Sequence, residues 1–280
     1  MKKESPVAAL LPLITHKEHA LLVSALKKKV THVECSLDLG LSISQITVTE
    51  KGWIWQNQSF PYLKKCKERT IYHWVDSAFE PISRYSDALI KLIATDWGAP
   101  TFEIDGIKML PTAKVSPYID AKNKVELIEP AGKTILDTCG GLGYFASWCI
   151  KKGAKKIHSF EKNPDVVWLR GINPWSPQTS DVLELTLGSI NEHVSSFANN
   201  SIDAVLHDPP RFGIAGELYS QAFYNQLARV LKHKGKLFHY TGMPNKLTSG
   251  RNVPQEVIKR LEKSGFTASI NGDGVFAIKN

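Results

Sequence analysis

Residues 134–144 read TILDTCGGLGY, and this stretch decides the fold. It begins as a short apolar run that ends on Asp137, which is typical of a buried parallel strand. A helix is predicted over 143–152, so the chain must turn sharply between the two elements. Because Gly141 and Gly143 carry no side chain, a ligand can approach the main chain closely at this turn. The stretch therefore predicts a strand, a ligand-binding turn and a helix.

Strand and helix patterns alternate from this stretch to the C-terminus. Strands are predicted at 156–160, 183–187, 202–207, 236–240, 266–270 and 275–278. Helices are predicted at 164–172, 190–197, 217–231 and 254–264, with a short one near 125–128. Such alternation gives a mostly parallel sheet with helices on both faces, completed here by a C-terminal antiparallel hairpin. We therefore predict an α/β, Rossmann-like domain whose ligands bind at the carboxyl ends of the strands.

The N-terminal part of the chain follows a different pattern, which predicts a smaller mixed α+β domain. Helices are expected at 16–29 and 83–97. Strands are expected at 30–37, 42–49, 52–58 and 104–110, the last with the turn residues Asp105 and Gly106. The chain is thus expected to divide into an N-terminal domain, 1–115, and a catalytic domain, 116–280. The smaller domain is a candidate for substrate docking.

An acidic residue ends the second predicted strand of the catalytic domain. Glu161 lies 24 residues after Asp137. A carboxylate at this place can accept hydrogen bonds from both ribose hydroxyls of an adenosine moiety. A nicotinamide dinucleotide site would place its acid similarly, so Glu161 indicates an adenosine cofactor without identifying it.

A sharper pattern follows the strand predicted at 202–207, where the sequence reads Asp208-Pro209-Pro210. The two prolines fix φ and remove two N–H donors, so this loop offers backbone carbonyls. The Asp208 carboxylate and the Pro209 carbonyl could accept hydrogen bonds from a substrate amine and aim its lone pair at an electrophilic methyl group. We therefore predict Asp208 and Pro209 to be the catalytic groups.

The glycine loop and the D-P-P sequence together resemble class I S-adenosylmethionine-dependent methyltransferases that act on amino nitrogens. More narrowly, the chain resembles a group of predicted methyltransferases best known from archaea. The shared segments are LDTCGGLGY, NPWS at 173–176, HDPPRFGIAGELYS at 207–220 and FHYTG at 238–242. The resemblance implies S-adenosylmethionine as the cofactor. Its expected contacts are Asp137, Cys139, Gly141, Gly143, Glu161, Ser189 and Asp208.

The chain departs from the usual methyltransferase pattern at two places. Arg211 stands where an aromatic residue usually follows D-P-P, and Phe212 comes next. Arg211 could stack on a ring or bind a phosphate or carboxylate. Ser189 stands near where an Asp often binds the adenine amino group. The residues expected to contact the substrate are Pro210, Arg211, Phe212, His239 and Tyr240.

The amino-acid composition indicates which binding partners and which cellular compartment to expect for this chain. The formal net charge of +8 favours an anionic partner such as nucleic acid. Basic residues cluster at 27–29 and 64–69, although solvated surface lysines explain each cluster equally well. The four cysteines form no C-x-x-C pair, so no metal site is expected, and their scatter suits a reducing cytosol. No apolar stretch approaches the roughly 20 residues that span a bilayer, so a cytoplasmic protein is expected.

These observations favour transfer of a methyl group to an amino nitrogen in RNA. An aminopropyl transferase acting on a polyamine stays open as a second enzyme class, with Asp105, Asp120 and Asp208 as the acids that it would need. A methyltransferase acting on a small molecule or a protein also stays open. A non-enzymatic binding module with the same fold is the third class, and it predicts no cofactor binding.

Overall fold

The computed structural model describes residues 12–211, 213–242 and 252–280. Residue contacts divide the chain into two compact units. The N-terminal unit comprises Met1–Asp120 with Trp168–Ser176, and the C-terminal unit comprises Ala121–Val167 with Pro177–Asn280. Among the described residues, no helix combines the length and apolar character that a membrane span requires.

The C-terminal unit is built on a seven-stranded sheet in the order β14-β13-β12-β15-β16-β18-β17. The parallel strands are β12 (Thr134–Asp137), β13 (Lys156–Glu161), β14 (Leu183–Leu187), β15 (Ile202–His207) and β16 (Leu231–Tyr240). A hairpin of β17 (Phe266–Asn271) and β18 (Gly274–Lys279) pairs with β16 antiparallel through β18. The strand order reverses between β12 and β15, which is where such sheets bind ligands. The predicted α/β, Rossmann-like sheet is confirmed.

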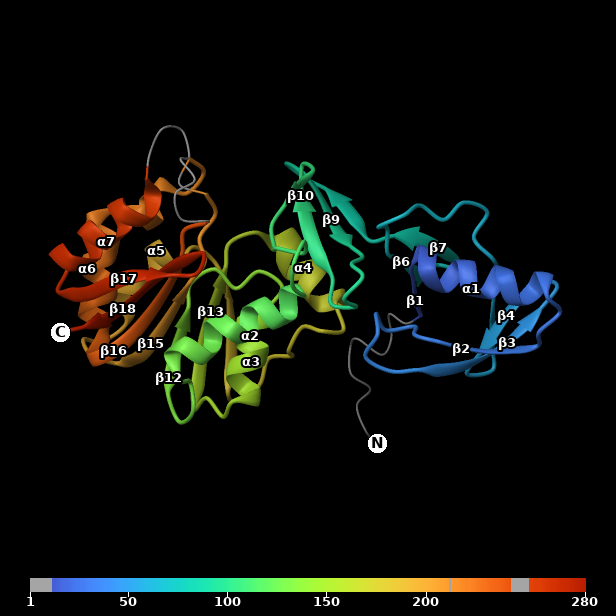
Figure 1. The fold of residues 1–280 in the computed structure, drawn as a ribbon, viewed down its shortest axis with the longest axis horizontal. Helices are drawn as coiled ribbons and strands as arrows, with labels where there is room; N and C mark the ends of the chain where they lie inside the picture. Colours follow the sequence, from blue (N-terminus) through green and yellow to red (C-terminus); the bar gives the residue numbers. More distant parts are fainter. Residues whose placement is uncertain (1–11, 212, 243–251) are drawn as a thin grey trace. The chain divides into compact units, whose positions relative to one another are not determined.

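Helices connect these strands. They are α2 (Pro117–Ile128), α3 (Tyr144–Lys151), α4 (Pro164–Ile172), α5 (Ile190–His193), α6 (Gln221–Val230) and α7 (Val253–Lys263). Figure 1 shows α3 beside β12 and β13, and α6 and α7 beside the strands that end the sheet. Alternate residues of each strand face opposite sides of the sheet. Leu136 and Phe160 therefore pack with α5 to α7 in one fully apolar core, where each buried side chain of this size contributes about 1.5–3 kcal/mol.

The connection after β15 differs from the single helix predicted at 217–231. A short 3-10 helix, η3 (Gly216–Tyr219), comes first, and α6 begins after Ser220. The Ser220 hydroxyl accepts a hydrogen bond from the backbone N–H of Phe223 and so caps α6. The predicted helix is also too long at its other end, because β16 begins directly at Leu231.

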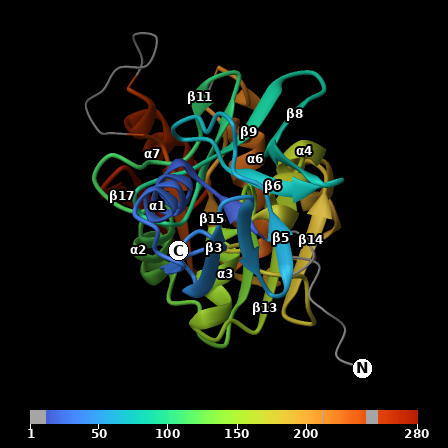
Figure 2. The ribbon, with the colours of Figure 1, turned by 90° about the vertical axis from the view of Figure 1, so that its right-hand side faces the viewer.

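The N-terminal unit holds three small antiparallel sheets. One contains β2 (His32–Cys35), β3 (Ser44–Thr49), β4 (Gly52–Trp55) and β5 (Gln58–Phe60), and α1 (His16–Lys27) packs against β2 and β3. Figure 2 turns this unit toward the viewer and shows α1 and the strands around it. The second sheet contains β1 (Leu13–Ile14), β6 (Tyr72–Val75) and β7 (Ala78–Pro81). The third contains β8 (Ser83–Tyr85), β9 (Leu89–Ile93), β10 (Thr101–Ile104) and β11 (Ile107–Lys108).

The helix predicted at 83–97 is wrong, because this segment forms β8 and β9. The apolar residues of β9 satisfy a helical period in the sequence, yet Leu92 pairs with Phe102 of β10 and Ile90 with Arg84 of β8. Pairing with strands on both sides outweighs the local pattern, since strand preference depends on neighbouring strands. The Asp105 and Gly106 turn is present: both residues have positive φ, 48° and 78°, and they join β10 to β11 as a hairpin.

Candidate functional site

The carboxyl ends of four parallel strands meet at one edge of the C-terminal sheet. The register pairs Asp137 at the end of β12 with Ser159 of β13 and Leu206 of β15. The next strand is in register too, since His207 at the end of β15 pairs with His239 of β16. Segments far apart in the sequence therefore bring their strand-end residues together at the switch in strand order.

The glycine loop after β12 is held in a tight turn by backbone hydrogen bonds. The Gly140 N–H donates to the Phe160 carbonyl at 2.6 Å, and the Gly143 N–H donates to the Gly140 carbonyl at 2.7 Å. Gly141 and Gly143 have φ of 49° and 80°, which side-chain-bearing residues rarely adopt. The Asp137 carboxylate is 1% exposed and accepts the Ser159 hydroxyl at 2.8 Å. Between the end of β12 and the start of α3, the loop therefore offers mainly backbone atoms to a ligand.

Glu161 bonds to the glycine loop, which the sequence did not indicate. One carboxylate oxygen accepts the Gly141 N–H at 3.0 Å, and the other accepts the Asn163 N–H at 2.9 Å. The half-buried carboxylate therefore holds the glycine loop against the end of β13. A carboxylate at this place in the fold is the type of group that accepts ribose hydroxyls.

The end of β14 leads into Gly188 and Ser189. The Gly188 N–H donates to the Glu161 carbonyl at 2.9 Å, which keeps this turn beside the end of β13. A side chain at Gly188 would lie 2.8 Å from the His193 ring, so it would have to displace that ring. Ser189 is half-buried at the start of α5, and its hydroxyl makes no capping hydrogen bond. That hydroxyl can serve as a polar contact for a purine edge.

The loop after β15 carries the D-P-P sequence. Asp208 is half-buried, Pro209 is buried, and the Pro210 carbonyl accepts the Tyr219 hydroxyl at 3.1 Å. Burial raises the pKa of the Tyr219 phenol, and the nearby Asp208 carboxylate adds to the rise, so the hydroxyl stays a donor. Arg211 is exposed.

Phe212 lies outside the described residues. Its predicted contact with the substrate therefore stays a prediction.

Cys139 lies among the acidic groups of the site. Burial raises the pKa of its thiol well above the ordinary value, and the Glu161, Asp208 and Asp137 carboxylates raise it further. The thiol is therefore neutral and not a nucleophile at physiological pH. A negative field from converging carboxylates suits a cationic ligand.

Two buried histidines lie near the ends of β15 and β16, and no sequence pattern indicated their hydrogen bonds. His207 donates from Nε2 to the Leu218 carbonyl at 3.1 Å and accepts the Thr138 hydroxyl at Nδ1. His239 donates from Nδ1 to the Tyr240 carbonyl at 2.8 Å and accepts the Tyr224 hydroxyl at Nε2. Burial lowers the pKa of His207 to about 3 and that of His239 well below its ordinary value. Both rings are therefore neutral.

The structure corrects the prediction that His239 contacts the substrate. Its side chain is fully buried, and both ring nitrogens are bonded within the protein. Its ring centroid lies 4.3 Å from that of His207, so the two rings pack together under the strand ends. His239 supports the site from below. A residue near the end of a strand need not face the ligand, because strand side chains alternate between faces.

Tyr240 is half-buried and has a neighbour that the sequence did not indicate. Lys124 of α2 is 5% exposed, and its ammonium lies 4.5 Å from the centre of the Tyr240 ring. The same ammonium forms an ion pair with Asp273 at 3.4 Å. A buried cation over the ring fixes its position through a cation–π contact.

Among the described residues, no group of three His, Cys, Asp or Glu side chains could hold a metal ion.

Comparison with known proteins gives the chain a family. It is 41% identical over 212 residues to the uncharacterized protein MJ1233 of Methanocaldococcus jannaschii, and the match covers 74% of this chain and 73% of that protein. The chain belongs to the family of MJ1233. No established family profile matches the chain.

Several solved structures resemble the chain over more than half of its length. The spermidine synthase of Thermotoga maritima is 18% identical with a TM-score of 0.52, covering 75% of this chain and 78% of that one. An S-adenosylmethionine-dependent methyltransferase from Aquifex aeolicus is 20% identical with a TM-score of 0.41, covering 56% of this chain and 87% of that one. The first likeness, together with the strand order, identifies the sheet as Rossmann-like.

Proposed function

We propose that the protein is an S-adenosylmethionine-dependent methyltransferase that acts on an amino nitrogen, and that RNA carries this nitrogen. The placement of the D-P-P loop supports the proposal most directly. Asp208 follows β15, whose Leu206 pairs with Asp137, so the carboxylate lies beside the strand end that starts the glycine loop. A binding site for an adenosine cofactor and a site for an amine would thus be neighbours. We also place the chain in the group of methyltransferases that its D-P-P-R-F segment resembles.

The cofactor would be held mainly by backbone and carboxylate groups of the C-terminal unit. Glu161 would bind the ribose hydroxyls, Ser189 would bind the adenine edge, and Gly141 and Gly143 would allow close approach. Asp137 and Cys139 would shape the floor of the site. The acidic surroundings of Cys139 also suit the positive sulfonium. When bound, S-adenosylmethionine supplies a methyl group that is already electrophilic, so the protein needs alignment more than strong base catalysis.

The amine would be positioned by the loop after β15. Because Tyr219 bonds the Pro210 carbonyl, that group serves as an anchor for the loop. We therefore assign the amine to Asp208 and the Pro209 carbonyl, which would each accept one N–H. In this arrangement the nitrogen lone pair would point away from both acceptors. The cofactor would supply the methyl group, and Asp208 would take the proton that the nitrogen loses on methylation.

RNA is the proposed substrate because the chain carries a formal net charge of +8 and an exposed Arg211 directly after the D-P-P sequence. A guanidinium there could bind a phosphate or stack on a base, as an aromatic residue would. Tyr240, whose ring is fixed by Lys124, is the other candidate for contact with the base. Binding should weaken as the salt concentration rises.

One labelling experiment tests this function. The purified protein is incubated with S-adenosylmethionine labelled on the methyl group, and RNA, protein and small-molecule fractions of a cell extract are separated. We expect label in RNA, and its loss in Asp208→Asn. The control is Asp181→Asn, which changes an exposed carboxylate outside the site. Label confined to small molecules or protein would contradict the RNA substrate, and no label in any fraction would contradict methyl transfer.

A second function, aminopropyl transfer to a polyamine, is favoured by one observation. The match to the spermidine synthase of Thermotoga maritima covers 75% of this chain, which is a larger share than the C-terminal unit alone makes up. A polyamine would need several carboxylates, but Asp105 accepts the Leu89 N–H within the N-terminal unit and is a turn residue. Incubation with decarboxylated S-adenosylmethionine and putrescine separates the two reactions. Formation of spermidine would establish the second function in place of the first.

A further inference from the structure

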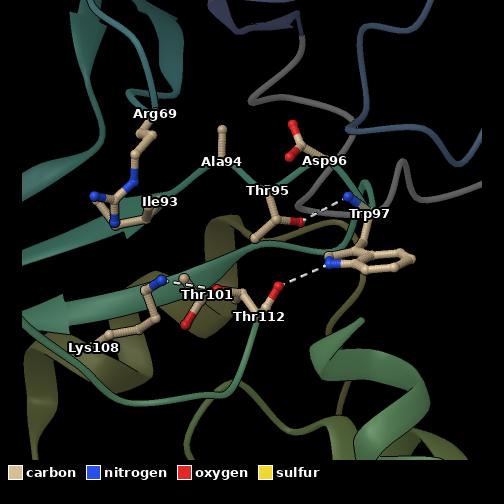
Figure 3. Close-up of a pocket in the computed structure, with 9 residues that line it drawn as sticks. All are labelled: Arg69, Ile93, Ala94, Thr95, Asp96, Trp97, Thr101, Lys108 and Thr112. Carbon is tan, nitrogen blue, oxygen red and sulfur yellow. Dashed lines mark hydrogen bonds between the residues drawn. The ribbon is translucent and has the colours of Figure 1, made fainter. Parts of the chain in front are cut away.

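The N-terminal unit contains a cavity that the proposed chemistry does not use. Figure 3 shows its lining, with Arg69 and Lys108 on one side and Trp97 on the other. Its volume is about 220 Å³, and threonines at 95, 101 and 112 are among the residues that line it. The cavity therefore combines two cations, an aromatic ring and several hydroxyls within one unit of the chain.

The Trp97 ring, which lines one side of the cavity, is held in place and is accessible to a ligand. The Trp97 indole N–H donates to the Thr112 carbonyl at 3.0 Å, and the Trp97 backbone N–H donates to the Thr95 hydroxyl at 3.2 Å. Even so, Trp97 is 47% exposed. A ligand in the cavity can therefore reach the indole ring. A ring held at its edge with an open surface is a platform on which a flat ligand can stack.

The two cations are also held in place. The Arg69 guanidinium bonds to Glu103 at 2.5 Å, and the Lys108 ammonium bonds to the Thr112 hydroxyl at 2.8 Å. The Arg69 side chain is still 58% exposed and has further N–H donors, because a guanidinium carries five. Its backbone has a φ of 59°, an uncommon value for arginine, and its carbonyl accepts the Ala94 N–H at the cavity wall.

The basic segment 64–69 continues from the cavity. Its cations are Lys64, Lys65, Lys67 and Arg69, and all four are exposed. The acidic groups nearby are Glu68, which is exposed, Glu103, which pairs with Arg69, and Asp96, which lines the cavity beside Trp97. Asp96 lies on the aromatic side and can accept N–H groups of a base, whereas the opposite side carries the cations. Separated in this way, the charges fit a nucleotide, with its anionic phosphate and its neutral base, better than a uniformly acidic peptide.

We propose that this cavity and segment 64–69 dock single-stranded RNA, with one base stacked on Trp97 and its phosphates at Arg69 and Lys108. The inference rests on the proposed function, of which it names the substrate-docking site. Phosphate contacts would give most of the affinity, and the stacked base would select unpaired over double-stranded RNA. None of the residues that line this cavity is among those proposed to hold the cofactor.

Binding of fluorescein-labelled ten-nucleotide RNA to the full chain, measured by anisotropy at several salt concentrations, tests the proposal. We expect Trp97→Ala to weaken binding about tenfold and Trp97→Phe much less, because a phenyl ring still stacks. Arg69→Gln with Lys108→Gln should lower the slope of log affinity against log salt by about 1.4, since each phosphate contact on a single strand contributes about 0.7. The control is Lys51→Gln in the exposed turn before β4. Thermal stabilisation by S-adenosylmethionine should be equal in all variants that fold.

The outcomes separate this inference from the proposed function. If wild-type protein methylates RNA and the cavity variants bind and methylate it like wild type, the docking site is overturned while the function stands. If the variants raise KM for RNA without lowering kcat, the docking site is supported. If oligonucleotides bind in a cavity-dependent way but no RNA is methylated, the docking site holds and the proposed function fails. Equal binding of double-stranded RNA would contradict the stacked base.

Discussion

The hydroxyl oxygen of Thr138 lies 2.6 Å from Nδ1 of His207, so the end of β12 is bonded to the end of β15 by two buried side chains. Thr138 precedes the glycine loop, and His207 precedes the D-P-P loop. His207 also reaches the Leu218 carbonyl, and Tyr219 reaches back to the Pro210 carbonyl. The two loops assigned to cofactor and amine are therefore parts of one hydrogen-bonded arrangement, and a change in one should affect the other.

Loss of the Tyr219 hydroxyl should lower turnover more than stability. In Tyr219→Phe the Pro210 carbonyl loses its anchor, so the D-P-P loop would hold the amine less well. We expect kcat to fall about tenfold and the free energy of unfolding to fall by about 1 kcal/mol, with cofactor affinity unchanged. Steady-state kinetics and urea unfolding measure the two effects.

Tyr224→Phe is the matched control for this prediction. It also removes a buried tyrosine hydroxyl, but one that bonds to His239 and not to the D-P-P loop. A similar loss of stability with kcat retained would show that the anchor acts on turnover. An equal fall of kcat in both variants would mean that Tyr219 acts only through general packing.

Glu161→Gln should weaken cofactor binding. The amide keeps one oxygen for a backbone N–H but loses the charge that strengthens bonds to hydroxyl donors. Hydrogen bonds to a charged group contribute roughly 1.5–3 kcal/mol, so Kd for S-adenosylmethionine should rise at least about tenfold. Isothermal titration calorimetry measures this Kd, with Glu192→Gln at an exposed position of α5 as the control. An unchanged Kd would exclude Glu161 from the ribose contact.

Much of the sheet could be predicted from the sequence, because its strands are apolar runs with turn-forming or polar residues at both ends. The predicted strand 183–187 and helix 164–172 match β14 and α4 at both ends. Parallel strands that end at one edge then place Asp137, Glu161 and Asp208 together with no further information.

The rest depends on contacts between distant residues, which no local pattern records. Tyr219 lies in η3 and Lys124 in α2, and no local pattern indicated a partner for either, yet one holds the Pro210 carbonyl and the other the Tyr240 ring. The helix predicted at 83–97 was wrong for the same reason. Residues 89–93 of this segment form β9 because they pair with β8 on one side and β10 on the other. His239 was assigned to the wrong face, since the sequence shows the end of a strand but not its orientation.

Gly143→Ala should disturb the turn that starts α3. Gly143 has a φ of 80° and is the residue before the helix, where a side chain is strained whatever space it finds. We expect the free energy of unfolding to fall by about 1–2 kcal/mol and cofactor affinity to fall with it. Gly171→Ala is the control, because that glycine lies inside α4 with open space around it. The control should be neutral or slightly stabilising, and equal effects of the two would contradict a strained turn at Gly143.

Acid should destabilise the protein already between pH 6.5 and 5, because His207 is buried in its neutral form. Burial lowers its folded-state pKa to about 3, whereas in the unfolded chain it titrates near 6.5. Below pH 6.5 the unfolded state therefore binds a proton that the folded state does not, and stability falls as the pH falls toward 3. At pH 5 the loss from His207 alone is about 2 kcal/mol, and His239, whose pKa is also lowered, adds to it. Urea unfolding at several pH values measures the slope, which His207→Gln should reduce and His233→Gln, at an exposed position, should leave unchanged. A free energy of unfolding that stays constant from pH 7 to 5 would contradict a neutral His207 and, with it, the hydrogen bond that Nδ1 accepts from Thr138.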